Sequence, residues 1–467
     1  MSFKDKLFQT NSIYSLIFIR IAFGIAAFWE CYNTTFTGLV YNYYVIPKFH
    51  FTYYGFEWIP RLPVEYLPWL FCVLMALSVL VIIGLFYRIS IILFTLGFTY
   101  IFLIEKATYL NHFYMIILCG VLLSIMPANR YFSFDSYFNP KIKTEKIAFW
   151  PIFLLRCQIE IMLIFAGLVK VNYDWLLRSQ PLKIWLGEYK TIEPLHYLFT
   201  QDWSLMMISW GVVILHLAGA PLLLWNRTRI YIFVIYCVFH VSNHFIFHVG
   251  SFPWMTIGVT TIFFAADWPK KIFKFFDKSE EISSFEKPSL LMQKILISFM
   301  AIWIAVQTLV PLRFLLYPNP SLVSWTNEGH RFAWRMKLNA FYSHTSFYVT
   351  DLDSREREQV RISDYLTLRQ FETMECQPDM MLEFAHYIHK VWTQEKGYKN
   401  VGVSVKALCS MNGREYKLMI DPDADLAHIE RSLKHNEWVL PLDLESPQVD
   451  LKSRQGQVMK KQKVCHP

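Results

Sequence analysis

The sequence predicts a mainly α-helical, polytopic membrane bundle of eight or nine transmembrane helices, followed by an extracytoplasmic α+β domain rich in β-strands. The 467 residues are 54% hydrophobic and 18% charged, whereas soluble proteins are about 45–50% apolar and about 25% charged. Residues 1–310 carry 24 Lys and Arg and 17 Asp and Glu, about 13% of that part, and residues 311–467 carry 21 and 20, about 26%. We therefore divide the chain into a transmembrane helical domain (1–310) and a soluble domain (311–467).

Nine apolar stretches in the first part approach the length of about 20 residues that a transmembrane helix needs. In order, they are Ile13–Cys31, Pro68–Phe86, Ile89–Ile104, His112–Met126, Ala148–Val169, Ser204–Trp225, Ile230–Phe247, Phe252–Ala266 and Leu291–Val310. Two of them are short and fit either complete spans or half-spans. The number of spans is therefore eight or nine.

The distribution of positive charge predicts the orientation of these spans. With nine spans and a cytoplasmic N-terminus, the inner loops carry 14 Lys and Arg and the outer loops carry six. Because loops rich in Lys and Arg stay in the cytoplasm, the chain is predicted to be an integral, multi-pass membrane protein. Residues after about 311 then lie on the extracytoplasmic side, and an even number of spans would reverse that side.

The pattern changes beyond Pro311. Residues Phe347–Val349, Val401–Leu408 and Tyr416–Ile420 alternate as strands do, and Asp364–Lys396 has the periodicity of a helix. About 150 residues is an ordinary size for one such domain.

Charge and cysteine usage exclude some classes of function. The net charge of +8 lies mainly beside the apolar stretches, where positive residues orient the spans in the membrane lipid. No run of basic residues indicates a nucleic-acid partner. Of the eight Cys, five lie in or beside apolar stretches, and Cys376, Cys409 and Cys465 lack CxxC or CxxH spacing. A zinc site or a redox pair is therefore not expected.

Charged residues inside the apolar stretches are costly and are usually paired or functional. Arg156 and Glu160 are four residues apart, so they are expected to pair on one helix face. Arg20 and Glu30 are expected to find partners on other helices. Lys170 ends the fifth stretch, in FAGLVKVNYDW, and from its position alone an ammonium group that extends to the membrane interface is the commoner alternative to a functional lysine.

Further polar residues lie at the same predicted outer side. Asn111 and His112 open the fourth stretch, and His240, His244 and His248 recur every four residues in FHVSNHFIFHVG. Such histidines can share a metal ion, but no acidic residue lies in the run, so no metal is expected. Polar groups from three helices predict a cavity in the outer half of the bilayer. The aromatic segment Tyr41–Pro60 fits either an interfacial belt or a loop over the mouth of a ligand site.

Seven stretches, in this order across both parts, are similar to the vitamin K-dependent gamma-carboxylase family, including bacterial-type members with the horizontally transferred transmembrane domain. They are FHFTYYGFEW (Phe49–Trp58), EKATYLNHFY (Glu105–Tyr114), FAGLVKVNYDW (Phe165–Trp175), FHVSNHFIFHVGSFPW (Phe239–Trp254), WTNEGHRFAWRM (Trp325–Met336), QPDMMLEFAHYI (Gln377–Ile388) and NGREYKLMIDPDADL (Asn412–Leu426). The resemblance covers about residues 13–445.

The resemblance implies a reaction and a set of site residues. In that reaction, O2 oxidises reduced vitamin K (the hydroquinone) to the epoxide, and this oxidation generates a strong base. The base removes a glutamate γ-proton, and the resulting carbanion adds CO2. Lys170 falls on the family's catalytic lysine, Asn111 and His112 match a pair beside the hydroquinone, and His240 matches a histidine of the carboxylation step. The stretch that contains Trp325, His330 and Trp334 corresponds to a region of glutamate recognition, which implies binding of a glutamate-containing peptide or protein.

Two departures from the family keep other functions open. The run Asn327–His330 differs from the animal enzymes, so their peptide substrate specificity does not carry over. The chain is also much shorter than they are, so propeptide recognition does not carry over. One alternative is a vitamin K hydroquinone epoxidase or oxygenase that does not carboxylate glutamate. Another is a non-enzymatic membrane receptor or assembly protein.

Overall fold

The computed structural model describes residues 2–187, 193–247, 249–273, 285 and 287–447. The chain divides into two compact units. The first, which we call the helical unit, contains Met1–Ile46, Ile59–Leu168 and Val212–Leu312, and the second, the mixed unit, contains Pro47–Trp58, Val169–Gly211 and Arg313–Pro467. This grouping in space adds Pro47–Trp58 and the longer segment Val169–Gly211 to the C-terminal part. The division by sequence after residue 310 stays a prediction.

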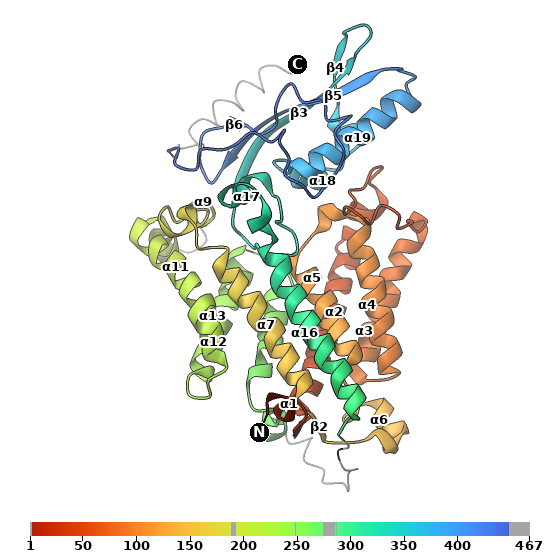
Figure 1. Cartoon of the computed structure of the whole chain (residues 1–467), viewed down its shortest axis with the longest axis vertical. Coiled ribbons are helices and arrows are strands. Elements are labelled where there is room, and N and C mark those ends of the chain that lie inside the picture. Colours follow the sequence, from red (N-terminus) through yellow and green to blue (C-terminus); the bar gives the residue numbers. More distant parts are fainter. Residues whose placement is uncertain (1, 188–192, 248, 274–284, 286, 448–467) are drawn as a thin grey trace. The chain divides into compact units, whose positions relative to one another are not determined.

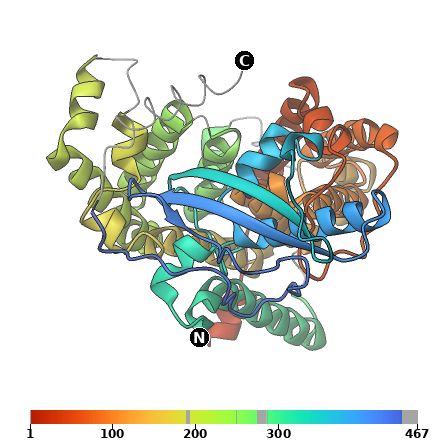
Figure 2. The ribbon, with the colours of Figure 1, turned by 90° about the horizontal axis from the view of Figure 1, so that it is seen from above.

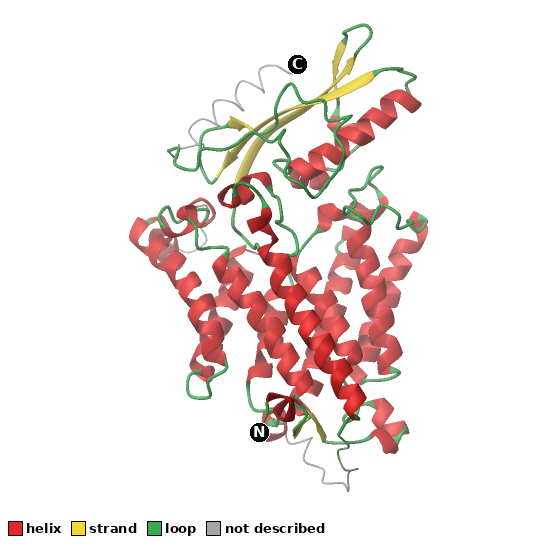
Figure 3. Ribbon diagram, in the orientation of Figure 1, coloured by secondary structure: helices red, strands yellow, loops and turns green. Residues whose placement is uncertain are grey.

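Helices form almost all of the helical unit (Figures 1 and 3). They are α1 (Phe3–Leu7), α2 (Tyr14–Phe36), α3 (Leu67–Ile83), α4 (Tyr87–Ile104), α5 (Asn111–Ile125), α6 (Phe134–Phe138), α7 (Trp150–Leu168), α12 (Ala220–Leu223), α13 (Arg229–Phe247), α14 (Phe252–Thr260), α15 (Trp268–Ile272) and α16 (Leu290–Leu312), and α11 (Asp202–Ile214) leads into α12. A short antiparallel pair, β1 (Thr10–Ser12) and β2 (Lys146–Ala148), completes this unit.

Among the described residues, seven helices are long and apolar enough to cross a membrane: Tyr14–Phe36, Val64–Ile83, Tyr87–Ile104, Trp150–Leu168, Asp202–Leu223, Arg229–Phe247 and Leu290–Leu316. The apolar helices Asn111–Ile125 and Phe252–Phe263 are shorter. All nine predicted stretches are thus largely helical. The count is nine if both shorter helices span the bilayer, eight if one does and seven if neither does. The predicted counts of eight or nine therefore stay predictions, and so does the orientation.

Arginines inside the helical unit bind main-chain carbonyls. Arg20 on α2 is fully buried and donates to the oxygens of Ala128 at 2.7 Å and Phe132 at 2.6 Å. The predicted pairing of Arg156 with Glu160 is wrong. Arg156 instead donates to three consecutive carbonyl oxygens, those of residues 262–264 at the end of the α14 segment, because the unsatisfied carbonyls of a helix C-terminus attract a cation.

A four-stranded antiparallel sheet of order β4-β3-β5-β6 forms the centre of the mixed unit. The long strands β3 (Phe341–Asp351) and β5 (Val401–Met411) pair along their whole length, from Phe341 opposite Met411 to Asp351 opposite Val401, and lie side by side in Figure 2. The edge strands β4 (Arg357–Gln359) and β6 (Lys417–Leu418) are short. The alternating pattern that predicted strands is therefore confirmed here.

The helices of the mixed unit are α8 (Tyr173–Leu176), α9 (Leu182–Gly187), α10 (Glu193–Thr200), the larger part of α11, α17 (Val323–Thr326), α18 (Leu368–Met374) and α19 (Pro378–Gln394). The predicted helix Asp364–Lys396 is therefore two helices. Thr367 and Gln370 form a capping box at the start of α18, and Pro378 begins α19 at a position where its missing N–H costs nothing.

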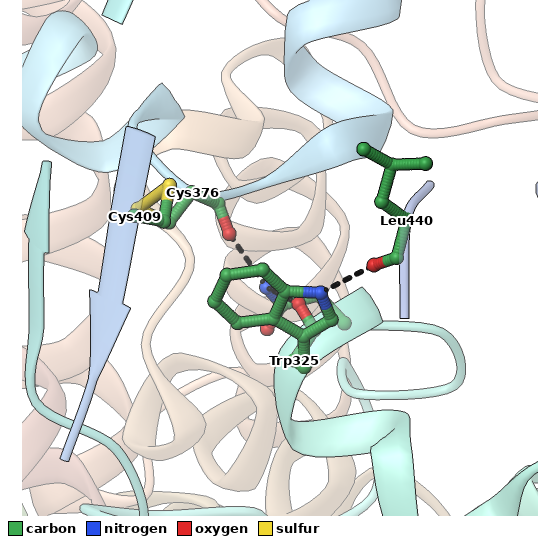
Figure 4. The surroundings of a disulfide bond; sticks show 5 residues. Trp325, Cys376, Cys409 and Leu440 are labelled. Carbon is green, nitrogen blue, oxygen red and sulfur yellow. Dashed lines mark hydrogen bonds between the residues drawn. A yellow bond between two sulfur atoms is a disulfide. The ribbon is translucent and has the colours of Figure 1, made fainter. Parts of the chain in front are cut away.

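A disulfide joins Cys376, just before α19, to Cys409 on β5 (Figure 4). The sequence alone left the pairing of the three C-terminal cysteines open, and Cys465 lies outside the described residues. Figure 4 also shows that the indole N–H of Trp325 donates to the carbonyl of Leu440, at 2.8 Å. The disulfide therefore joins the start of α19 to β5, and the indole bond joins α17 to the segment that contains Leu440.

The segment Pro47–Trp58 packs within the mixed unit. The carboxylate of Glu383 on α19 accepts hydrogen bonds from the main-chain N–H and hydroxyl of Thr52, at 2.5 and 2.7 Å. Arg431 donates to the Thr52 carbonyl at 2.9 Å, and the ring of Phe49 stacks on Tyr387 at 4.5 Å. These contacts tie the second half of the aromatic segment to the C-terminal part of the chain.

Candidate functional site

In the helical unit, three elements bring a carboxylate, an imidazole and a hydroxyl together. Glu30 lies on α2, His112 in the first turn of α5, and Ser251 directly before α14. His112 Nε2 is 3.4 Å from Glu30 Oε2, which also accepts a short hydrogen bond from the Ser251 hydroxyl. All three side chains are buried. The carboxylate therefore orients the His112 ring and favours a proton on its Nε2 atom.

His240 on α13 lies beside this group. Its ring is 3% exposed, and within the described part of the chain neither ring nitrogen has a hydrogen-bond partner. The ring of Phe252 is 6.1 Å from His240 and 6.2 Å from His112, and Tyr236 stacks on His240 at 6.0 Å. Because a buried polar atom normally has a partner, His240 has the open donor and acceptor capacity of a ligand-binding residue.

The remaining predicted residues of the helical unit differ in burial and contacts. Asn111 is half-buried, and its Oδ1 accepts a hydrogen bond from the Tyr109 hydroxyl at 3.2 Å. His244 packs against the ring of Trp254 at 5.4 Å. His248 lies outside the described residues. Among those that are described, no group of three or more His, Cys, Asp or Glu could hold a metal ion.

Lys170 lies in the mixed unit, two residues after α7 ends at Leu168. The side chain is 6% exposed, its Nζ donates to the Met336 carbonyl at 3.3 Å, and it lies over the Trp175 ring, 5.2 Å from the centroid. This is not the exposed ammonium group that the interfacial alternative requires. Burial, and then the positive charge of Arg335, lower the pKa of Lys170 to about 7. A lysine in this state can act as a base near neutral pH.

The loop that carries Lys170 is anchored by a buried ion pair. Asp174 accepts hydrogen bonds from both terminal nitrogens of Arg414, at 2.5 and 2.7 Å, and from the amide of Asn412 at 2.8 Å. Asn172 caps the short helix α8 through the main-chain N–H of Trp175. Lys170 is therefore held between α7 and a turn that is fixed to the end of β5.

The segment that contains Met336, the hydrogen-bond acceptor for Lys170, has an unusual backbone conformation. Asn327, Phe332, Trp334 and Lys337 all have positive φ angles, between 50° and 61°. In residues other than glycine this conformation is uncommon, costs about 1–3 kcal/mol each and gathers at functional sites. Periodicity gives no signal for such a loop, so the sequence could not predict it.

The three residues of the predicted substrate region differ in exposure. Trp325 and Trp334 are completely buried, so their side chains pack in the interior and support the backbone of this segment. His330 is partly exposed, but its Nδ1 atom is buried and has no hydrogen-bond partner within the described residues. Burial and the charges of Arg335, Arg331 and Arg313 lower the pKa of His330 to about 3, so its ring is neutral at physiological pH.

The structure therefore brings the predicted residues together in two groups. His112 and His240 share the helical unit, and Lys170, His330 and Trp334 share the mixed unit, so the predicted convergence of both groups in one cavity stays a prediction. Sequence reasoning did not assign Glu30 or Arg335 to the site. Glu30 could have been identified, because a carboxylate within a predicted span is usually functional or paired. Arg335 could not, because it lies in a predicted soluble segment, where arginines are common.

Comparison with known families covers nearly the whole described chain. Residues 8–268, more than half of the 467, match the HTTM domain family. Residues 292–445 match the lumenal domain of vitamin K-dependent gamma-carboxylase. No solved structure matches the chain. The two matches follow each other in the order that the sequence resemblance implies.

Proposed function

Because this chain belongs to the vitamin K-dependent gamma-carboxylase family, we propose that it couples oxidation of reduced vitamin K to carboxylation of glutamate in a peptide or protein. The match to a lumenal domain and the seven apolar helices indicate a multi-pass membrane protein with a lumenal C-terminal domain. In the proposed reaction the hydroquinone and O2 give the epoxide and water. The glutamate γ-carbon loses a proton and forms a bond to CO2, so the enzyme is a carboxylase of the lyase class.

The single observation that carries this proposal is the state of Lys170. Its pKa of about 7 leaves a large share of the amine neutral at physiological pH, whereas an ordinary lysine is almost fully protonated. The amine takes a proton from the hydroquinone hydroxyl, and the Met336 carbonyl holds Nζ in place. Burial keeps water away, which matters because a carbanion is quenched by any available proton.

The residues of the helical unit fit a hydroquinone. When bound, this group supplies the oxidation by O2 that generates the strong base needed for a γ-proton. His240 has two buried ring nitrogens and no hydrogen-bond partner among the described residues. It can accept a hydrogen bond from a hydroxyl of the hydroquinone or donate one to an oxygen on that ring. His112, oriented by Glu30, can hold or move a proton at Nε2, and Asn111 offers an amide. The apolar helices suit an isoprenoid tail, and O2 and CO2 act as co-substrates.

The mixed unit supports recognition of a peptide on the lumenal side. A disulfide between Cys376 and Cys409 is typical of oxidising compartments. The segment with Trp325, His330 and Trp334 is the region where we propose that a glutamate-containing partner binds. Membrane lipid, quinone and this peptide are the proposed partners, with no nucleic acid and no metal.

The experiment that tests the proposal measures two products separately. Purified full-length protein is incubated with reduced vitamin K, labelled bicarbonate and a Glu-containing peptide, beside a known carboxylase as positive control. We expect both epoxide and label fixed in the peptide. Epoxide without fixed label would refute carboxylation and leave a quinol epoxidase. Neither product would favour a receptor or assembly protein.

A further inference from the structure

A turn formed by residues 425–429 packs against α19 and the start of β5 in the mixed unit. The carboxylate of Asp425 accepts a hydrogen bond from the main-chain N–H of Val403, on β5, at 2.8 Å. At the other end of the turn, the carbonyl oxygen of Ile429 is 2.8 Å from Nε2 of His386, on α19. The turn is therefore held in position by both the strand and the helix.

Two histidine rings meet where this turn lies on α19. The centre of the His428 ring, on the turn, is 5.4 Å from the centre of the His389 ring, on α19. The side chain of His428 is 58% exposed, and His389 is half-buried. The pair therefore lies at the surface of the mixed unit, where an ion from solution can reach it.

Hydrogen bonds set the tautomer of both rings. His389 Nδ1 is 3.0 Å from the carbonyl oxygen of Val401, and His428 Nδ1 is 2.8 Å from Oδ2 of Asp425. Carbonyl and carboxylate oxygens accept hydrogen bonds, so the proton of each neutral ring is on Nδ1 and the lone pair is on Nε2. Metal-binding histidines have this arrangement, in which the second ring nitrogen donates to a carbonyl or a carboxylate.

The positions of the two rings fit a shared metal ion. Both Nδ1 atoms point to groups at the start of β5, namely the Val401 carbonyl and the carboxylate that binds Val403. Because Nε2 lies across the ring from Nδ1, both Nε2 atoms point away from the strand. An ion about 2.0–2.1 Å from Nε2 lies about 3.2 Å from the ring centre, so two rings at a tetrahedral angle have centres about 5.2 Å apart. The observed separation of 5.4 Å agrees with this value.

We propose that the Nε2 atoms of His389 and His428 bind a divalent transition-metal ion of the Zn²⁺ class. Imidazole suits such ions, whereas Ca²⁺ and Mg²⁺ prefer oxygen ligands. The described residues contain no metal-binding group of three or more His, Cys, Asp or Glu, so water completes the coordination. The ion links α19 to the turn of residues 425–429. The proposed reaction uses no metal and none of these residues, so the two proposals can fail independently.

Zinc binding tests the site without quinone or turnover. Purified full-length protein without an affinity tag is treated with a chelator, freed of it, and titrated with ZnCl2 in a calorimeter. We expect a saturable site that binds one Zn²⁺ per chain and is unaffected by millimolar Ca²⁺ or Mg²⁺. Absence of a saturable site, or displacement of Zn²⁺ by an equal concentration of Ca²⁺, would overturn the proposal.

Substitutions assign the site to its ligands. His428→Gln and His389→Gln each remove one ligand and should weaken zinc binding at least about tenfold, and Asp425→Asn, which removes the charge behind the His428 ring, should weaken it about 10–100-fold. His344→Gln, at an exposed histidine of β3, is the matched control and should keep full binding. Because His428 is exposed, H428Q should fold even if H389Q does not.

The link between α19 and the turn gives a second measurement. An ion that binds only the folded protein stabilises it, so Zn²⁺ should raise the unfolding temperature of the wild type and of H344Q, but not that of H428Q. Unchanged zinc binding in folded H428Q protein would show that His428 is not a ligand and would overturn the proposal. An equal loss of binding in H344Q, or an equal rise of the unfolding temperature in H428Q, would also contradict it.

Discussion

Asp174 and Arg414 form a buried, two-point ion pair, with oxygen–nitrogen distances of 2.5 and 2.7 Å. Arg414 is 1% exposed and follows β5, and Asp174 lies four residues after Lys170. The pair therefore fixes the position of the loop that carries the proposed base to the sheet of the mixed unit.

Removing one partner of this pair should strongly destabilise the mixed unit. Asp174→Ala leaves the Arg414 charge buried and unpaired, and we expect a loss of about 3–5 kcal/mol in the free energy of unfolding. Thermal or denaturant unfolding of the purified protein measures it. The double variant Asp174→Leu with Arg414→Met should recover much of the loss, and Asp202→Ala, which removes an exposed partner of Lys183, should change stability little. A D174A protein as stable as wild type would contradict the anchoring role.

The disulfide should contribute to stability through the loop that it closes. Cys376 and Cys409 are 33 residues apart, and for a loop of that length the chain-entropy relation gives about 3–4 kcal/mol. We expect Cys376→Ser to lower the unfolding temperature by several degrees. Mass spectrometry after alkylation without reductant should find these two cysteines unmodified, and alkylation of both in native protein would argue against the bond.

Glu30 should act on quinol oxidation through His112. Glu30→Gln removes the charge that orients the His112 ring, and we expect epoxide formation to fall at least about tenfold, since positioned acid–base groups contribute roughly 10²–10⁴-fold. The loss should appear in kcat more than in KM, and Glu30→Asp should partly restore it. Glu65→Gln, at an exposed glutamate, is the matched control. An unchanged kcat in E30Q would exclude the positioning role.

The orientation of the mixed unit can be tested at the β3–β4 turn. Ser354 is exposed there, and a cysteine introduced by Ser354→Cys should react with a membrane-impermeant thiol reagent added outside intact cells. The exposed free Cys72 is replaced by serine to lower the background. Protection of the new cysteine until the cells are opened would contradict the nine-span orientation.

Much of the fold could be predicted because it follows from local patterns. Long apolar runs dictate helices, and alternation predicted strands at Phe347–Val349 and Val401–Leu408, which lie within the paired strands β3 and β5. The break before Pro378 was missed because the apolar periodicity of α18 and α19 continues across it. The pairing of Arg156 was predicted from spacing alone, and carbonyls more than 100 residues away compete better for its guanidinium.

The site was harder to predict because it depends on contacts between distant segments. Lys170 could be proposed only through the resemblance, since a buried lysine and an interfacial one look alike in sequence. The partner of Glu30, His112, is 82 positions away along the chain. The positive φ angles around Trp334 arise from packing of the whole segment, which no local propensity encodes.

The pH dependence of epoxide formation tests the central claim, that buried Lys170 is the base, most directly. The neutral form is the active one, and its share rises with pH through the pKa of about 7. The initial rate of the wild type should therefore rise across neutral pH and level off above it, and Lys170→Ala should lose about 10²–10⁴-fold while it still folds. A folded K170A protein that keeps the wild-type rate and pH profile would contradict the claim.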